Sequence, residues 1–239
     1  NQVGQLGDGM TLDRDVPAPV SVTGWAPAPP VAEVPLTWAS ISAGGDHTCA
    51  LTPAGKAYCW GNGGQGQLGN ATSDLRLTPW EVTGGNTWAS ISAGETYTCG
   101  ATTVGEGFCW GSEQYSGRLG LGYQQWWTNT PVRVASPSGS SGVKWSRIVA
   151  SRGTQTCGLT TDGRLYCWGD NGYGLGVGDG TTSRQYVPVA VAAPAGGQWD
   201  KVSVGNSHSC ALTTAGAAYC WGNGGQGQLG TGDSAGVSV

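Results

Sequence analysis

The segment that decides the fold runs from residue 48 to residue 61 and reads TCALTPAGKAYCWG. A hairpin centred on Ala54 places Cys49 opposite Cys59, and Gly55 supplies the left-handed residue that a three-residue hairpin loop requires. In this register the two sulfur atoms face each other across neighbouring strands, at a separation that suits a disulfide. The segment therefore predicts a β-hairpin closed by a disulfide.

The same frame occurs four times in the 239 residues. Each frame opens on a tryptophan, and the intervals between Trp38, Trp88, Trp145 and Trp199 are 50, 57 and 54 residues. All eight cysteines fall in these frames, always ten positions apart, as Cys49/Cys59, Cys99/Cys109, Cys157/Cys167 and Cys210/Cys220. Self-similarity at this length is typical of solenoids and propellers. We predict a single propeller domain, or a segment of one, over residues 1–239, with repeats at 19–69, 79–122, 131–180 and 188–232 and partial repeats at 1–18 and 233–239.

Disulfides explain the cysteines better than metal sites do. One hairpin offers only two ligands, and the two histidines of the chain do not recur in all four frames, so a four-ligand site is not formed. By loop entropy each bridge contributes about 2.7 kcal/mol to stability. We expect no metal and no cofactor. Because disulfides persist in oxidising compartments, we expect an extracellular protein, secreted or on a cell surface.

The pattern of short strands between Gly and Pro residues, without helical spacing, predicts an all-β chain. In the first hairpin Leu51 faces one side while Tyr58 and Trp60 face the other, so both faces are apolar and both must be covered. Strands stacked between neighbouring blades meet this demand, which favours a β-propeller of four-stranded blades. We expect each blade to begin with a strand led by proline, followed by the tryptophan strand and then by the two cysteine strands. The proline-led strands begin at Pro19, Pro79, Pro131 and Pro188, and a fifth begins near Val237.

Composition excludes several classes of function. Charged residues make up 11% of the chain, where about 25% is usual, while Gly (44) and Trp (12) are abundant. The net charge of −4, without a basic run, gives nucleic-acid binding no electrostatic source. No apolar stretch is long enough for a membrane span. We therefore expect protein partners or self-association, with carbohydrate as the alternative, and no nucleic acid.

These motifs resemble the repeat of the regulator-of-chromosome-condensation family. The stretch ISAG, then HTCALT, YCWGN and GQLG follows that repeat, and the last turn recurs at residues 4–7, 66–69, 117–120 and 227–230, with a looser version at 174–178. The resemblance implies a propeller, commonly of seven blades. Four cysteine-bearing units do not fill seven blades. The chain is then either an arc cut from a longer polypeptide, which we favour, or a ring that closes with few blades. The namesake is a nuclear exchange factor for a small GTPase that docks on nucleosomes. The expected disulfides, the acidity and the lack of a basic arm oppose that role here.

Catalytic residues are not expected. His47 and His208 precede their cysteines by two positions, but Tyr97 and Gln155 replace them in the sister repeats, so we interpret both histidines as structural. Glycoside hydrolysis needs two converging carboxylates, and none of the five glutamates recurs in frame. The glycine-rich run 169–180 has too few acids for a calcium loop and precedes no helix. We expect a protein that is not an enzyme.

Two features exceed the repeat. Trp126 and Trp127, with Tyr123 nearby, occupy the longest insertion and offer a stacking surface for a sugar or a protein groove; the alternative is that one ring caps the blade. Asn70 begins the sequon Asn-Ala-Thr and is the predicted site of N-glycosylation. The stretches 26–30 and 137–141 have the composition of linkers or O-glycosylated segments.

Two functional hypotheses follow. The first is a non-enzymatic extracellular propeller, a segment of a larger cell-surface, wall or appendage glycoprotein, that presents loops and joins neighbouring chains. The second is a secreted recognition module, lectin-like or inhibitor-like, that binds carbohydrate or protein through Tyr123, Trp126 and Trp127.

Overall fold

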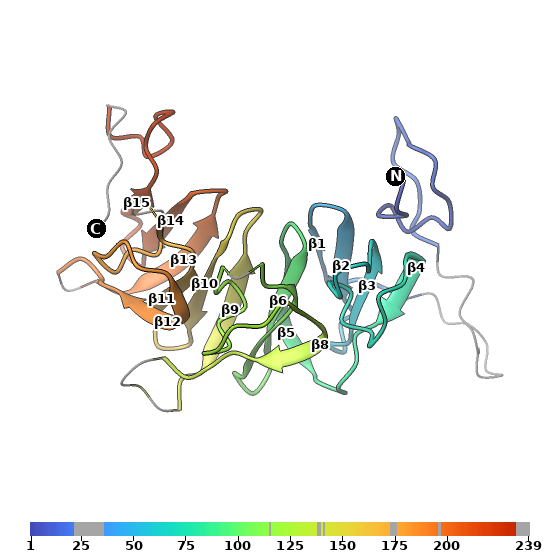
Figure 1. Ribbon diagram of the computed structural model, residues 1–239, viewed down its shortest axis with the longest axis horizontal. Helices are drawn as coiled ribbons and strands as arrows, with labels where there is room; N and C mark the ends of the chain where they lie inside the picture. Colours follow the sequence, from blue (N-terminus) through green and yellow to red (C-terminus); the bar gives the residue numbers. More distant parts are fainter. Residues whose placement is uncertain are drawn as a thin grey trace.

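The computed structural model describes residues 1–21, 36–114, 116–137, 140, 142–172, 176–195 and 197–232. Within these residues the regular structure is made of strands and turns, arranged as four antiparallel sheets that stand side by side in an open arc (Figure 1). Residues 1–21 lie beside the first sheet, at one end of the row, and the fourth sheet lies at the other end. The all-β class and the propeller-type arrangement predicted from the sequence are confirmed.

The first sheet contains β1 (Ser40–Ala43), β2 (His47–Leu51), β3 (Ala57–Gly61) and β4 (Arg76–Glu81). The second contains β5 (Trp88–Ala93), β6 (Tyr97–Thr102), β7 (Gly107–Ser112) and β8 (Trp127–Arg133). The third contains β9 (Trp145–Ala150), β10 (Gln155–Thr160), β11 (Leu165–Gly169) and β12 (Gln185–Val191). The fourth contains β13 (Trp199–Val204), β14 (His208–Thr213) and β15 (Ala218–Gly222).

The expected order of strands within a blade is wrong. The strand that contains the proline closes a sheet instead of opening it: β4 pairs with β3 through Tyr58 opposite Glu81 and Cys59 opposite Trp80. The expected starts of these strands are also wrong, because β4, β8 and β12 begin before their prolines and residues 19–21 form no strand. The chain then crosses beneath the hairpin tip to the next sheet, where the amide of Trp88 donates to the carbonyl of Gly55 at 2.8 Å. The predicted repeats are therefore out of phase with the sheets by one strand. Several predicted features lie outside the described residues: Val22 of the first expected strand, the linker-like stretch 26–30, residues 138, 139 and 141 of the second such stretch, and residues 233–239 with the strand expected near Val237.

The four hairpins form as predicted. Cys49 pairs with Cys59 in the register, and the corresponding disulfide joins each pair of cysteine strands: Cys49–Cys59, Cys99–Cys109, Cys157–Cys167 and Cys210–Cys220, each with Cα atoms 4.1 Å apart. Gly55 has the expected positive φ of 76°. Every residue of β2 and β3 is buried, which confirms that both faces of the hairpin are covered.

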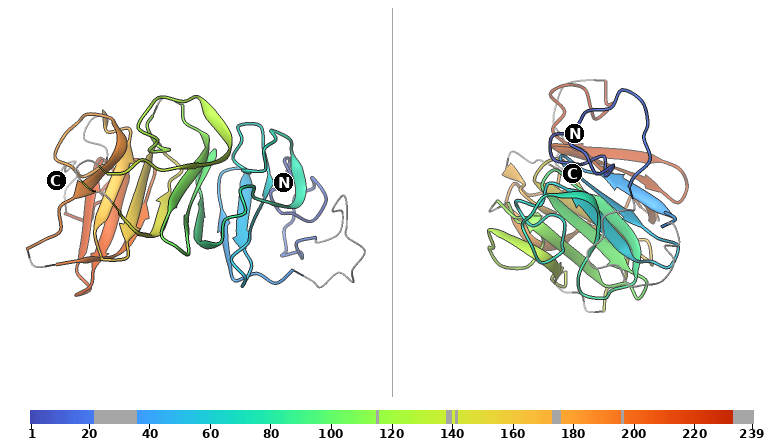
Figure 2. Two further views of the ribbon diagram at one scale, coloured as in Figure 1. Left: turned by 90° about the horizontal axis from the view of Figure 1, so that it is seen from below. Right: turned by 90° about the vertical axis from the view of Figure 1, so that its right-hand side faces the viewer.

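The sheets pack face to face through rings and aliphatic side chains. In the second sheet the ring of Trp88 lies 5.6 Å from Phe108 and 5.5 Å from Trp110, and the other sheets repeat this triad. The first strands of neighbouring sheets lie against each other: the amide of Ala93 donates to the Ser42 hydroxyl and the amide of Ala150 to the Ser92 hydroxyl. Figure 2 shows the sheets stacked in this way from two further directions.

The turn of sequence type Gly-x-Leu-Gly locks each sheet to the next. The carbonyl of Gln67, inside the turn 66–69, accepts the Trp110 indole N–H at 3.0 Å and the Thr98 hydroxyl at 2.8 Å, both from the second sheet. Gly69 has φ +66°, and a Cβ there would lie 2.5 Å from Trp110 Nε1. Equivalent carbonyls accept the indoles of Trp60, Trp168 and Trp221. The sequence motif is thus an interlock between sheets.

The same loops cover the outer edges of the sheets. The amide of Gly9 donates to Leu77 of β4, that of Ala71 to Asn129 of β8, and that of Gly122 to Tyr186 of β12. Exposed strand edges recruit other chains, so these contacts protect the three four-stranded sheets from uncontrolled pairing. None of the described segments forms a helix of the length and hydrophobicity that crossing a bilayer requires.

Candidate interaction surface

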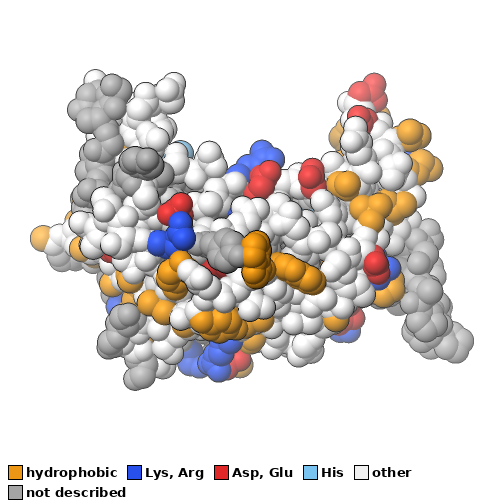
Figure 3. Space-filling view, in the orientation of Figure 1, with side chains coloured by type: hydrophobic (Ala, Val, Ile, Leu, Met, Phe, Trp, Pro, Cys, Tyr) orange, Lys and Arg blue, Asp and Glu red, His pale blue; other side chains and the backbone are white. Residues whose placement is uncertain are grey.

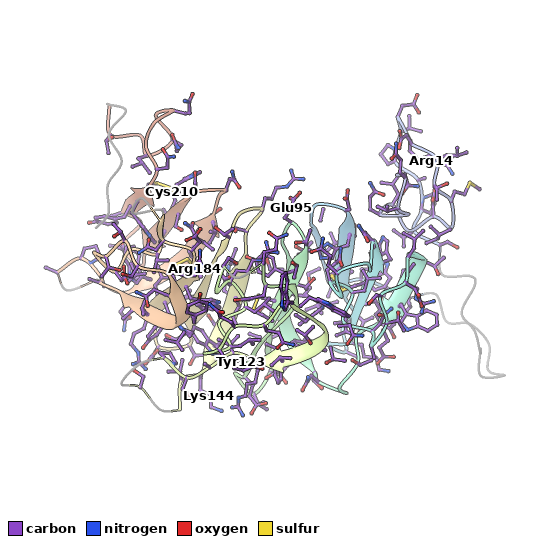
Figure 4. All side chains as sticks on the ribbon, viewed as in Figure 1. Arg14, Glu95, Tyr123, Lys144, Arg184 and Cys210 are labelled. Atoms are coloured by element: carbon purple, nitrogen blue, oxygen red, sulfur yellow. A yellow bond between two sulfur atoms is a disulfide. The ribbon has the colours of Figure 1, made fainter. Side chains whose placement is uncertain are left out.

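Tyr123, Trp126 and Trp127 lie on one face of the molecule, in and beside the loop that precedes β8; we call these three residues the aromatic platform. Their exposed fractions are 54%, 67% and 44%, whereas most other tryptophans of the sheets are buried. Figure 3 shows hydrophobic side chains gathered in the middle of this face, in front of β8, and Figure 4 places Tyr123 on it. The predicted exposure of the loop aromatics is present, and binding there stays a prediction.

The backbone of the second sheet holds the platform. The amide of Glu113 donates to the carbonyl of Trp126 at 2.9 Å, and Trp127 pairs with Ser112 as the first residue of β8. The side chain of Gln125 donates to the carbonyl of Trp127 at 3.3 Å. These bonds fix the main chain of the loop at both of its tryptophans, so little main-chain freedom is lost on binding.

Side chains of the third sheet meet the platform at its edge. The side-chain Nε2 of Gln124 donates to the hydroxyl of Tyr186, in β12, at 2.8 Å, and the guanidinium of Arg184 donates to the same oxygen at 3.4 Å. The Arg184 and Gln124 bonds hold the pKa of Tyr186 below its usual value. Arg184 also pairs with Asp170 at 3.6 Å (Figure 4 labels Arg184). The surface around the rings therefore presents amides, a phenol and a balanced ion pair.

Two charged residues beneath the platform were missed by sequence reasoning. Arg118 replaces the glutamine of the GQLG turn and is 2% exposed; its guanidinium donates to the carbonyl of Ser112 at 2.6 Å and lies 4.7 Å from the Tyr97 ring centroid. Glu113 is 1% exposed and accepts the Leu119 amide at 2.8 Å. Burial raises the pKa of Glu113 to about 7 and lowers that of Arg118. The departure from GQLG at position 118 was the available signal.

The predicted glycosylation site, Asn70, is buried. Its Oδ1 accepts the Thr72 amide and hydroxyl, both at 3.1 Å, while its Nδ2 has no hydrogen-bond partner among the described residues. The equivalent positions after other Gly-x-Leu-Gly turns hold Asp8 and Asp179, whose carboxylates accept the amides of Met10 and Thr181 in the same way. Such turns favour Asn or Asp, so a structural reason exists for this asparagine. Glycan occupancy stays a prediction.

His47 lies inside the joint between the first and second sheets. Its Nε2 is 2.8 Å from the Thr98 hydroxyl oxygen, which itself donates to the carbonyl of Gln67. The Thr98 oxygen must then accept a hydrogen bond from the Nε2–H group, so Nδ1 carries no proton. Nδ1 has no hydrogen-bond partner among the described residues. Burial lowers the pKa of His47 to about 4. This is the environment of a neutral packing residue, as the sister positions Tyr97 and Gln155 indicate.

Within the described residues no group of three or more His, Cys, Asp or Glu side chains gathers into a metal-binding arrangement. Glu106 and Arg133 pair at 3.0 Å, as do Glu95 and Arg152 at 3.1 Å. These acids are tied to surface arginines rather than directed at a shared point.

A row of disulfide-bearing β-sheets, interlocked by tryptophans and carrying an exposed aromatic loop, belongs to the class of β-propeller repeat scaffolds. Two family models with the description "Regulator of chromosome condensation (RCC1) repeat" match the chain. The first matches residues 38–67 and 199–228, and the second matches residues 54–101 and 162–212. Together they cover more than half of the chain. The protein belongs to the RCC1 repeat family.

Curated relatives agree with this assignment, and solved structures share the fold. The chain is 34% identical to the ultraviolet-B receptor UVR8 of Arabidopsis thaliana over 98% of its own length and 50% of that protein. It is 35% identical to the mitochondrial RCC1 domain-containing protein RUG3 of the same plant, over 80% of this chain and 43% of that one. Human WBSCR16 superposes with a TM-score of 0.78 at 22% identity, over 100% of this chain and 59% of that one. Yeast RCC1 (Prp20), solved with Kap60, superposes with a TM-score of 0.72 at 23% identity, over 87% of this chain and 49% of that one. The chain spans about half the length of these relatives.

Proposed function

We propose that this chain is a non-enzymatic interaction propeller of an extracellular or cell-surface protein, and that the aromatic platform is its contact surface for another protein chain. The observation that carries the proposal is the exposure of three large rings on a loop fixed between two sheets. Tyrosine and tryptophan contribute most of the binding energy in many protein interfaces. The four disulfides support an oxidising compartment.

The chemistry around the rings defines the partner. Arg184 is already paired with Asp170, and the amides of Gln124 and Gln125 are engaged within the loop region. A partner surface that is apolar and uncharged fits this platform, so binding should depend little on ionic strength. Yeast RCC1 (Prp20), which shares this fold, was solved bound to a protein, Kap60.

A second candidate is recognition of neutral carbohydrate. The Trp126 ring suits the apolar face of a sugar, and the side-chain oxygens of Gln124 and Gln125, whose N–H groups bond to Tyr186 and Trp127, can accept sugar hydroxyl groups. This candidate needs no partner chain, which makes the two separable by experiment.

The test uses sedimentation velocity over a wide range of protein concentration, together with an array of neutral glycans. The variant Trp126→Ala with Trp127→Ala removes the platform, and Val104→Ser removes an exposed apolar side chain at a hairpin tip as the control. Self-association that the double variant loses and the control keeps supports the protein-contact function. Glycan binding lost only in the double variant would replace it with the second candidate. Neither kind of binding would overturn the proposed role of the platform.

A further inference from the structure

Glu113 is bonded once to the loop that carries the aromatic platform and once to the turn before that loop. Its amide donates to the carbonyl of Trp126 at 2.9 Å, and its Oε2 accepts the amide of Leu119 at 2.8 Å. The residue is therefore positioned to fix both the Gly117–Gly120 turn and the loop that follows it.

The joint between the third and fourth sheets shows what this position does when it is neutral. There Asn171 takes the place of Glu113: its Oδ1 accepts the Val177 amide at 3.4 Å, and its Nδ2 donates to the carbonyl of Thr181 at 2.7 Å. Val177 corresponds to Leu119, since each precedes the last glycine of its turn, Gly178 or Gly120. Thr181 corresponds to Tyr123, since each lies three residues after that glycine. The sister side chain thus uses a donor as well as an acceptor.

An ionised carboxylate has acceptors only, whereas a protonated carboxyl also has an O–H donor. Only the protonated form of Glu113 can reproduce both bonds of Asn171. We propose that protonation of Glu113 fastens the loop that carries the aromatic platform, through a bond to the carbonyl of Tyr123, and that ionisation releases it. This inference rests on the proposed function only in assigning the platform as the surface that is regulated.

The charges around Glu113 allow this change within the neutral range. Arg118, in the same turn, and Arg184, before β12, both favour its ionised form. Tyr186 of β12 also interacts with it, and Tyr97 and Glu95 act on Arg118. Burial of the carboxyl, which raises its pKa, outweighs the hydrogen bonds from the Leu119 and Gly117 amides and the charges of the two arginines, which lower it, so the pKa lies at about 7. The platform loop should be closed in mildly acid solution and open in mildly alkaline solution.

Hydrogen–deuterium exchange tests the loop without any partner. The intact chain is labelled at about pH 5.5 and about pH 8.5, with times scaled to intrinsic exchange, and protection is compared for residues 119–126. We expect protection to fall by about tenfold or more at the higher pH in the unsubstituted chain. In Glu113→Gln, which keeps a donor at every pH, protection should stay high, and the loop from Gly176 to Thr181 should be unaffected in both proteins.

The reciprocal variant is Asn171→Asp, which introduces a titratable carboxyl at the sister position and should make exchange of the 176–181 loop depend on pH. Equal protection of residues 119–126 at both pH values in the unsubstituted chain would overturn the inference. So would an unchanged pH response in Glu113→Gln. A pH-dependent loop in a chain that binds neither itself nor glycans would leave this inference standing and remove the proposed function.

Discussion

The neutral imidazole of His47 should make the stability of the joint between the first two sheets sensitive to acid. Its pKa is lowered from 6.5 to about 4 by burial, so the unfolded chain binds a proton more readily than the folded chain. The contribution of His47 to stability is therefore complete above about pH 6.5 and is lost as the pH falls toward 4. Linkage gives a loss of about 2 kcal/mol between about pH 8 and about pH 5.

Glu113 acts in the opposite direction. Its pKa is raised from 4.5 to about 7, so its ionisation destabilises the folded chain at high pH and the penalty disappears as the pH falls. As the pH falls from about 8 to about 5, protonation of Glu113 therefore raises the free energy of unfolding by about 2 to 3 kcal/mol. The two effects nearly cancel, and the unsubstituted chain should show almost constant stability between about pH 8 and about pH 5.

Single variants separate the two groups. His47→Gln introduces the residue that stands at sister position 155, so it removes the titration with a side chain the fold already uses. The assay is denaturant unfolding with disulfides intact, followed by tryptophan fluorescence at the two pH values. Relative to His47→Gln, the unsubstituted chain should lose about 2 kcal/mol on acidification. An equal change in the free energy of unfolding of the two proteins between the two pH values would refute the assignment of a buried neutral imidazole.

Three further results are expected. Gly69→Ala should lower the free energy of unfolding by about 2 kcal/mol or more, because the new Cβ would meet Trp110 and φ is positive. The control Gly230→Ala has a similar φ but no atom within 4 Å of the new Cβ, and it should lower the free energy of unfolding by about 1 kcal/mol. Equal losses in the two variants, measured by denaturant unfolding, would contradict the interlock. Replacing Cys99 and Cys109 together by alanine should lower the free energy of unfolding by about 2 to 3 kcal/mol. When the native chain is alkylated without reduction, mass spectrometry should find no alkylated cysteine. Asn70→Asp should leave the melting temperature nearly unchanged, since Asp8 and Asp179 make the same turn, while a much lower value would show that the Asn70 amide nitrogen is needed.

Local chemistry was sufficient for the hairpins. The ten-residue cysteine spacing and the glycine at position 55 left one register, and the observed pairing of Cys49 with Cys59 follows it. The alternation of Leu51 with Tyr58 and Trp60 also required cover on both faces. The exposure of Trp126 and Trp127 followed from their place in a polar insertion. Each of these conclusions depends on neighbours within about fifteen residues, which sequence patterns report directly.

The strand order could not be obtained in this way. A proline-led strand can pair with the cysteine strand before it or the tryptophan strand after it, and both choices satisfy the same pattern. The pairing of β4 with β3 was decided by the crossing of the chain beneath the hairpin tip, from Val82 to Trp88. That crossing depends on the position of a neighbouring sheet.

The sequence by itself determined that this protein is a repeated, disulfide-closed β-structure with one aromatic insertion. Only the tertiary structure showed that the Gly-x-Leu-Gly turns are interlocks, that Asn70 is turned inward, and that Glu113 and Arg118 lie buried below the platform. The physical reason is distance along the chain: burial and pKa depend on which sheets meet at a joint. The contacting groups there lie far apart in the sequence, 43 residues in the bond of Trp110 to Gln67 and 62 in the bond of Gln124 to Tyr186.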